Sequence, residues 1–196
     1  MGQGRGMRAS WIAGLLLVGL LIAFRVISAA GFLPNFSPLP ALFLCSIIFF
    51  RGTRAWLLPV LAWVVTDPLV SIIQGYPVIG PHHVGIAVGL LASVLLGLAL
   101  RRRPSNANVL LGSMGAAFLF YFVTNLLSFL GDPLYAKNVT GFIQSQWTGP
   151  QGFPPTWIFL RNLAAANLLF TGLFLAARPA WCSITTEPNL LPAKTR

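Results

Sequence analysis

Long runs of apolar residues, separated by short polar segments, organise this sequence of 196 residues. A helix that crosses a lipid bilayer needs about 20 predominantly apolar residues. Six runs approach or reach that length: 10–30, 38–50, 55–73, 84–100, 109–130 and 157–177. The pattern predicts an all-α fold, a polytopic membrane bundle of six transmembrane helices.

The composition supports a chain that is embedded in lipid. Apolar residues make up 56% of the chain, charged residues only 8%, and the mean hydropathy is +0.78. A soluble domain carries roughly 25% charged residues, so this chain has too few to cover a surface that faces water. We expect residues 1–178 to form a single transmembrane domain and residues 179–196 to form a disordered cytoplasmic tail.

The basic residues predict the orientation of the chain. With six spans, four basic clusters face the same side, whereas the opposite loops carry only Lys137. These clusters are Arg5 and Arg8; Arg51 and Arg54; Arg101, Arg102 and Arg103; and Arg178, Lys194 and Arg196. Because basic loops stay on the cytoplasmic side, both termini are expected in the cytoplasm of a bacterial plasma (inner) membrane. Cleavage of the first run as a signal peptide is an alternative that would leave five spans in the same orientation.

Polar residues of five helices are expected at one depth, toward the outer face. A charge inside the bilayer costs about 2.5–3.5 kcal/mol on insertion scales, so each one needs a reason. The residues at this depth are Arg25, Asp67, His83 beside His82, Asn125 with Tyr121 on the same helix face, and Arg161. Asn35 joins them from the proline-rich stretch before the short second run. These residues predict a substrate-binding pocket open to the outer face, with an excess of positive charge that suits an anionic or zwitterionic solute.

Each of these residues also has an ordinary structural interpretation. Arg25 and Arg161 have long side chains that can reach the outer headgroups, and Asp67 can serve as a structural counter-ion for one of them. Adjacent histidines on a loop, such as His82 and His83, are more typical of solvent-facing residues than of metal ligands. We therefore expect no metal site and no cofactor.

Small residues recur at every fourth position of the fourth run, at Gly85, Gly89, Ser93 and Gly97. Ala9 and Ala13 have the same spacing at the start of the first run. Such stripes let another helix approach closely. The approaching helix belongs either to the same chain or to a partner subunit, which would make Ala9, Ala13, Gly85 and Gly89 partner-docking residues.

Several motifs resemble those of an uncharacterised bacterial family of six-helix membrane proteins described as candidate transport proteins. They are Asn35-Phe-Ser-Pro-Leu-Pro-Ala-Leu, the arginine-rich turn after the second run, Thr66-Asp67, Phe122-Val-Thr-Asn125 and Leu134-Tyr-Ala-Lys-Asn-Val-Thr-Gly-Phe142. The layout is similar to that of the substrate-binding S components of energy-coupling-factor transporters, over residues 25–177. The resemblance implies a vitamin-like solute near the outer face and an ATPase module in other chains. It also implies contact with a transmembrane coupling subunit through a pattern like Ala9-Ser-Trp-Ile-Ala13.

Enzyme signatures are missing from the sequence. It contains no Gly-x-x-x-x-Gly-Lys-Ser/Thr, no His-Glu-x-x-His and no Gly-x-Ser-x-Gly, and Asp67 is its one acid within an apolar run. We expect a protein that is not an enzyme, does not bind nucleic acid, and acts as a substrate-binding membrane subunit for uptake of a small, charged, vitamin-like solute. Two alternatives remain open: a stand-alone proton-coupled carrier that uses Asp67, and a non-transport scaffold or assembly subunit.

Overall fold

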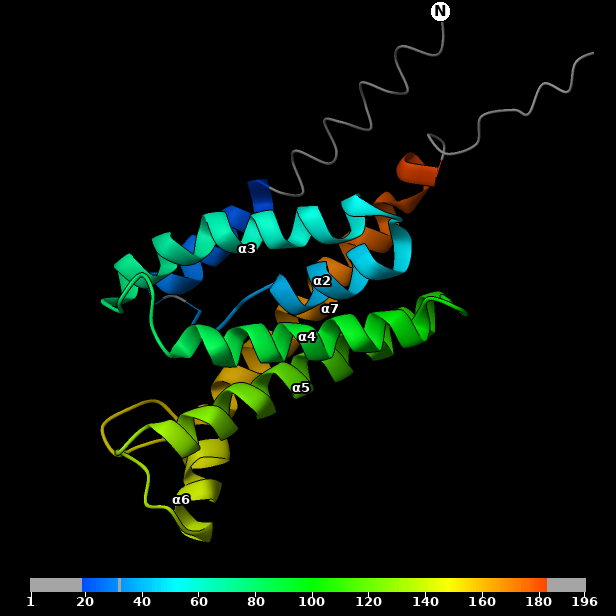
Figure 1. The fold of residues 1–196 in the computed structure, drawn as a ribbon. Coiled ribbons are helices and arrows are strands. Elements are labelled where there is room, and N and C mark those ends of the chain that lie inside the picture. The colour runs from blue at the N-terminus through cyan, green and yellow to red at the C-terminus, as the bar shows by residue number, and fades with distance from the viewer. Residues whose placement is uncertain (1–18, 32, 183–196) are drawn as a thin grey trace, which may run out of the picture.

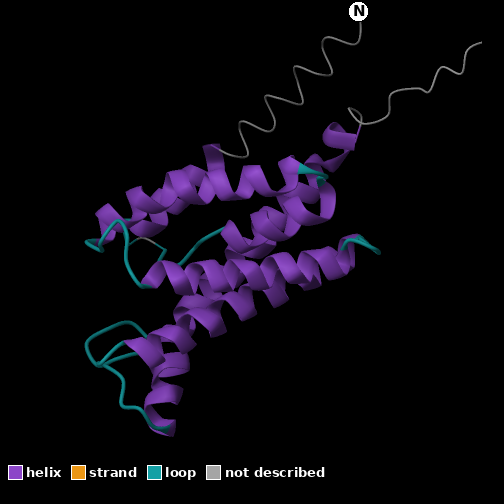
Figure 2. Ribbon diagram, in the orientation of Figure 1, coloured by secondary structure: helices purple, strands orange, loops and turns teal. Residues whose placement is uncertain are grey.

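The computed structural model describes residues 19–31 and 33–182, and within them all regular structure is helical (Figures 1 and 2). The chain forms a helix over Gly19–Ala29, then α2 (Leu39–Phe49), α3 (Thr53–Gln74), α4 (His82–Leu100), α5 (Asn106–Gly131), α6 (Val139–Ile143), the π-helical turn η1 (Gln144–Thr148) and α7 (Thr156–Cys182). The predicted all-α class is confirmed for the described residues. Ala9 and Ala13 lie outside the described residues, and so do residues 183–196 of the predicted tail.

Four helices are long and apolar enough to cross a membrane. They contain the spans Ala55–Gln74, His82–Leu100, Asn106–Gly131 and Thr156–Ala177. Each agrees with a predicted run to within about three residues, since a long apolar stretch bounded by Gly, Pro or Arg leaves little freedom for its ends. Gly19–Ala29 and Leu39–Phe49 are shorter apolar helices. The structure thus supports a membrane protein with four membrane-length helices among those described.

The short helix α2 forms the core of the bundle. Its 11 residues extend about 16 Å at 1.5 Å per residue, which is about half of a 30 Å hydrocarbon layer. Every residue from Leu39 to Ile48 is buried, because α3, α4, α5 and α7 surround the helix (Figure 1). A helix that is apolar on all sides is stable where protein covers it. Helix α2 is therefore an internal element that the longer helices enclose.

The small residues of α4 are used for packing inside the chain. Gly85 and Gly89 are buried against α5, and a Cβ added to Gly89 would come within 2.7 Å of Phe120 Cδ2. A Cβ added to Gly97 would lie 3.1 Å from the carbonyl oxygen of Leu44 in α2. The stripe thus lets α4 approach both α5 and the core helix. Gly85 and Gly89 thus have an intramolecular packing role, and the partner-docking role that the sequence allowed for them stays a prediction.

Basic loops gather at one end of the bundle. Arg101, at the end of α4, donates from Nη2 to the carbonyl oxygen of Phe50 at 3.0 Å, which joins the α4–α5 loop to the α2–α3 turn. The loop 75–81 and the segment 132–155, which contains α6 and η1, lie at the opposite end (Figure 1). The long helices thus separate an arginine-rich end from an end where the last turns of α3 meet the first turn of α4.

Candidate functional site

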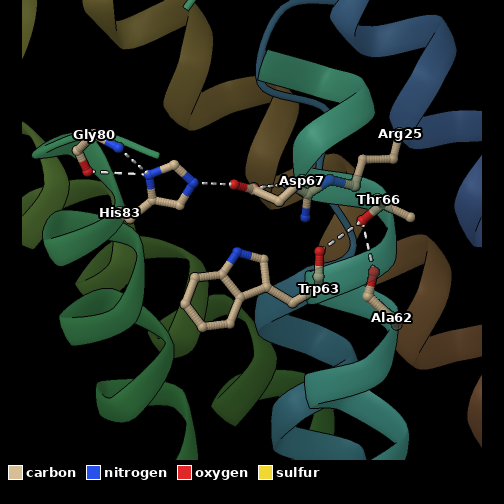
Figure 3. Close-up of polar contacts among 7 residues, drawn as sticks. All are labelled: Arg25, Ala62, Trp63, Thr66, Asp67, Gly80 and His83. Atoms are coloured by element: carbon tan, nitrogen blue, oxygen red, sulfur yellow. Dashed lines mark hydrogen bonds and ion pairs between the residues drawn. The ribbon is translucent and has the colours of Figure 1, made fainter. Parts of the chain in front are cut away.

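The turn between α3 and α4 brings an aspartate and a histidine together. Helix α3 ends at Gln74, and Gly75 adopts the left-handed conformation with φ of 72°, which glycine accepts without strain. After the short loop 75–81, α4 starts at His82, directly after Pro81. The first turn of α4 therefore lies beside the last turns of α3, and His83 faces Asp67 (Figure 3).

Asp67 contacts basic side chains from two other helices. Its Oδ1 lies 2.5 Å from Nη2 of Arg25, and its Oδ2 lies 2.7 Å from Nε2 of His83. The side chains of Arg25 and Asp67 are only 7% and 6% exposed, and that of His83 is 25% exposed. We call this set the Arg25–Asp67–His83 cluster. It joins three of the seven residues that the sequence analysis selected as substrate contacts.

Several polar atoms of the cluster are buried and have no hydrogen-bond partner among residues 19–31 and 33–182. Arg25 uses Nη2 on Asp67, but its Nε and Nη1 have no acceptor. The contact between His83 and Asp67 does not have hydrogen-bond geometry, so Oδ2 lacks a donor. The indole Nε1 of Trp63 also lacks an acceptor, and Figure 3 shows it turned toward the cluster. Because buried polar atoms are almost always paired, this concentration indicates a place for a further polar group, water or ion.

Backbone groups of the turn hold the ring of His83. Its Nδ1 lies 3.1 Å from the amide nitrogen of Gly80 and 3.0 Å from the carbonyl oxygen of the same residue. A neutral ring can accept from this N–H, whereas a ring with a proton on Nδ1 can donate to the C=O. The His82 ring lies beside it, with 4.1 Å between the ring centroids. Both histidines are thus close to Asp67.

The other predicted contacts lie elsewhere on the helices. Asn125 donates from Nδ2 to the Tyr121 carbonyl oxygen at 2.9 Å, and the buried Tyr121 hydroxyl donates to the carbonyl oxygen of Gln146 in η1. Arg161 is exposed, with Nε and Nη2 each 3.2 Å from Asn162 Oδ1. Within the described residues, the hydrogen bonds of Asn125 and Arg161 stay on their own helices, and none joins the cluster.

Arg161 and Asn35 have local structural roles. The Arg161 guanidinium lies 5.5 Å from the ring centre of Trp157, an arrangement typical of an interfacial anchor. Asn35 has a φ of 59°, and Asn tolerates this left-handed conformation in turns better than most residues. Asn162, which the sequence analysis did not select, donates to the Pro34 carbonyl oxygen at 2.9 Å and ties this turn to α7.

The cluster is mostly closed to solvent, because Arg25 and Asp67 are buried and His83 is only partly exposed. A small cavity elsewhere among the described residues has a volume of about 10 Å³, and apolar side chains line it. Its lining consists of Leu21, Pro38, Ala41, Leu42, Phe170 and Phe174. The open pocket predicted from the sequence thus stays a prediction.

Chemically, the cluster offers three options. The free donors of Arg25 and Trp63 can bind an anionic group. The contact between Asp67 and His83 can carry a proton, and the imidazole and carboxylate groups can bind a cation. Trp63 lies four residues before Asp67 on α3, so the helical i−4 spacing was the signal that could have identified it.

The chain matches a family model over most of its length. The family model DUF6580, described as a family of unknown function, matches residues 6–184 of this chain. The match includes every helix that contributes to the cluster. No curated protein and no solved structure matches the chain.

Proposed function

We propose a function from the site itself, since this chain belongs to the DUF6580 family, whose function is unknown. In this proposal, the chain is a substrate-binding membrane subunit for uptake of a small, charged, vitamin-like solute. The Arg25–Asp67–His83 cluster is the binding site in this proposal. The anionic group of the solute binds there, between the helix Gly19–Ala29, α3 and α4.

The observation that carries this proposal is the unused donor capacity of Arg25. One nitrogen of its guanidinium contacts Asp67, while Nε and Nη1 are buried and have no acceptor in the part of the chain that the structure describes. A guanidinium presents its N–H groups in a planar fork that matches the two oxygens of a carboxylate or the oxygens of a phosphate. An anionic solute would satisfy these donors.

The position of the cluster suits uptake from outside the cell. It lies at the end of the bundle opposite the loop that carries Arg101, Arg102 and Arg103 (Figure 1). In the orientation favoured by the positive-inside rule, that basic end faces the cytoplasm and the cluster faces outward. Arg25 and Asp67 are nearly fully buried, so solute binding requires Gly19–Ala29 or α4 to move away from α3.

Energy for uptake would come from other chains. The sequence has no nucleotide-binding Gly-x-x-x-x-Gly-Lys-Ser/Thr motif. Its six apolar runs are similar in layout to the S components of energy-coupling-factor transporters, which work with a transmembrane coupling subunit and ATPases. We propose the same division of labour here.

A stand-alone proton-coupled carrier is the second candidate, and the contact between His83 and Asp67 favours it. Intramembrane pairs of carboxylate and imidazole groups mark proton pathways in many transporters. His83 is partly exposed and Asp67 is buried, so the pair extends from the surface into the bundle.

Reconstitution into liposomes separates the two candidates. The assay offers a defined mixture of carboxylate-bearing vitamins and their precursors outside the vesicles and measures their accumulation inside by mass spectrometry. A substrate-binding subunit retains a compound without accumulating it, even under an inward proton gradient. Accumulation that requires the proton gradient alone supports the carrier, and a protein that neither retains nor accumulates any compound argues against both.

A further inference from the structure

The structure places three side chains with metal-binding atoms at one point. Asp67, His82 and His83 each offer a ligand atom, and these atoms lie within 4.8 Å of one another. We propose that they form a binding site for a divalent transition-metal ion of the zinc type. This inference goes beyond the uptake function and does not depend on it.

The donor types select the class of metal. Two imidazole nitrogens and one carboxylate oxygen form a set that suits zinc and its neighbours, whereas calcium and magnesium prefer sites built from oxygen atoms. Three protein ligands leave the fourth tetrahedral position free for water or for an anion. His82 and His83 are adjacent in the sequence and Asp67 comes from another helix, so the metal would fix α3 against the start of α4.

The outer contacts of the ligands are those of a metal site. A histidine that binds a metal through one ring nitrogen usually donates its other N–H to a carbonyl or a carboxylate. His83 Nδ1 lies 3.0 Å from the Gly80 carbonyl oxygen, which leaves Nε2 directed at Asp67. Asp67 Oδ1 is held by Arg25, which leaves Oδ2 directed at His83. His83 and Asp67 are thus each oriented through the atom that would not bind the metal.

The facing atoms are close to the separation that a metal requires. Two ligands at 2.0–2.2 Å on a tetrahedral ion lie about 3.4 Å from each other. Nε2 of His83 and Oδ2 of Asp67 are 2.7 Å apart, so an opening of about 0.7 Å would admit the ion. Oδ2 is buried and has no hydrogen bond, and a metal ion would give it a partner.

The positive charge of Arg25 should lower the affinity of the site for the metal ion. Its guanidinium lies on the far oxygen of Asp67 and repels a divalent cation. The metal should therefore bind more weakly than in a closed structural zinc site, and it should exchange with the solution. An exchangeable ion with a free coordination position is suited to binding an external anion.

Competition with a chelator measures the affinity and stoichiometry of Zn²⁺ binding. The full chain is purified in detergent through a tag without histidine, in a Cys182→Ser background, and Zn²⁺ is titrated against a chromophoric chelator. The chain holds only two histidines, so binding that depends on histidine must come from this site. We expect one Zn²⁺ per chain, with affinity lowered about 100-fold or more in His83→Gln and in Asp67→Asn.

Two further variants distinguish the loss of a zinc ligand from a loss of folding. His83→Cys should restore zinc binding, because a thiolate is also a zinc ligand, whereas a merely structural role for His83 would give no rescue. Asp132→Asn changes an aspartate of the α5–α6 loop and should bind zinc as the unmodified chain does. Absence of zinc binding by the unmodified chain, or equal binding by the unmodified chain and His83→Gln, would overturn the proposal.

Discussion

Arg25 and Asp67, which are 42 residues apart in the sequence, form an ion pair with 2.5 Å between Nη2 and Oδ1. Neither side chain has appreciable contact with solvent. A buried charge is tolerated when a partner of opposite charge lies beside it. The pair therefore fixes the helix Gly19–Ala29 against α3 and places the unused donors of Arg25 at the candidate site.

Neutralising one member of this pair should destabilise the protein strongly. Asp67→Leu leaves a buried guanidinium without a counter-ion, and Arg25→Met leaves a buried carboxylate with His83 alone. Each should lower the free energy of unfolding by about 3–5 kcal/mol, measured by thermal unfolding in detergent. The double variant Arg25→Met/Asp67→Leu leaves no unpaired charge, so it should be more stable than either single variant. Simple additivity of the two losses would show that the residues are not coupled.

A side chain at Gly89 should weaken the packing between α4 and α5 and lower the stability of the protein. In Gly89→Ala the new methyl group meets the buried ring of Phe120, and overpacking of this kind costs about 1–3 kcal/mol. Gly172→Ala in α7 is the matched control, because its Cβ would meet no atom of the described residues within 4 Å. That control should be neutral or stabilising by up to about 1 kcal/mol, since alanine favours a helix. Equal unfolding temperatures for the two variants would contradict the packing.

Cysteine labelling should place the two ends of the bundle on opposite sides of the membrane. Gln151 lies in the loop before α7 and Asn106 at the start of α5, and both are exposed. In a Cys182→Ser background, a membrane-impermeant maleimide should label Gln151→Cys in intact cells and Asn106→Cys only after permeabilisation. The reverse pattern would place the candidate site on the cytoplasmic side and remove the proposed route of uptake.

The hydroxyl of Tyr135 should make the stability of the folded state depend on pH. It lies in the loop between α5 and α6, where burial, aided by the charge of Asp132, raises the pKa of its hydroxyl above the ordinary value of 10. The folded state therefore favours the neutral phenol. This contribution to stability is complete below pH 10 and is lost as the pH rises through the folded-state pKa. The unfolding temperature of the unmodified chain should fall more steeply above about pH 10 than that of Tyr135→Phe.

The sequence predicted the four membrane-length helices, for a simple physical reason. Apolar runs such as 109–130 are too long and too uniform to form anything except membrane-length helices. The shortness of the second run likewise indicated an unusual helix, which proved to be the enclosed α2. The cost of a charge in lipid also identified Arg25 and Asp67 as residues that require a partner.

The pairing within the site could not be predicted in the same way. Counting residues along a helix gives the depth of a side chain but not the direction in which the helix face points. Arg25 and Arg161 were therefore equivalent candidates for Asp67, and the structure pairs Asp67 with Arg25. Trp63 was missed because an indole in an apolar helix looks like an ordinary core residue until its Nε1 is found without an acceptor.

A thermal-shift comparison tests whether the cluster binds an anionic solute. The unmodified chain and the Arg25→Met/Asp67→Leu variant are screened against the same panel of vitamins, their precursors and small organic anions. A ligand that binds only the folded state adds about 2.7 kcal/mol of stability at a hundredfold excess over Kd. We expect at least one anion to raise the unfolding temperature of the unmodified chain and not that of the variant. An equal rise in both proteins would contradict the assignment of the binding site to Arg25 and Asp67.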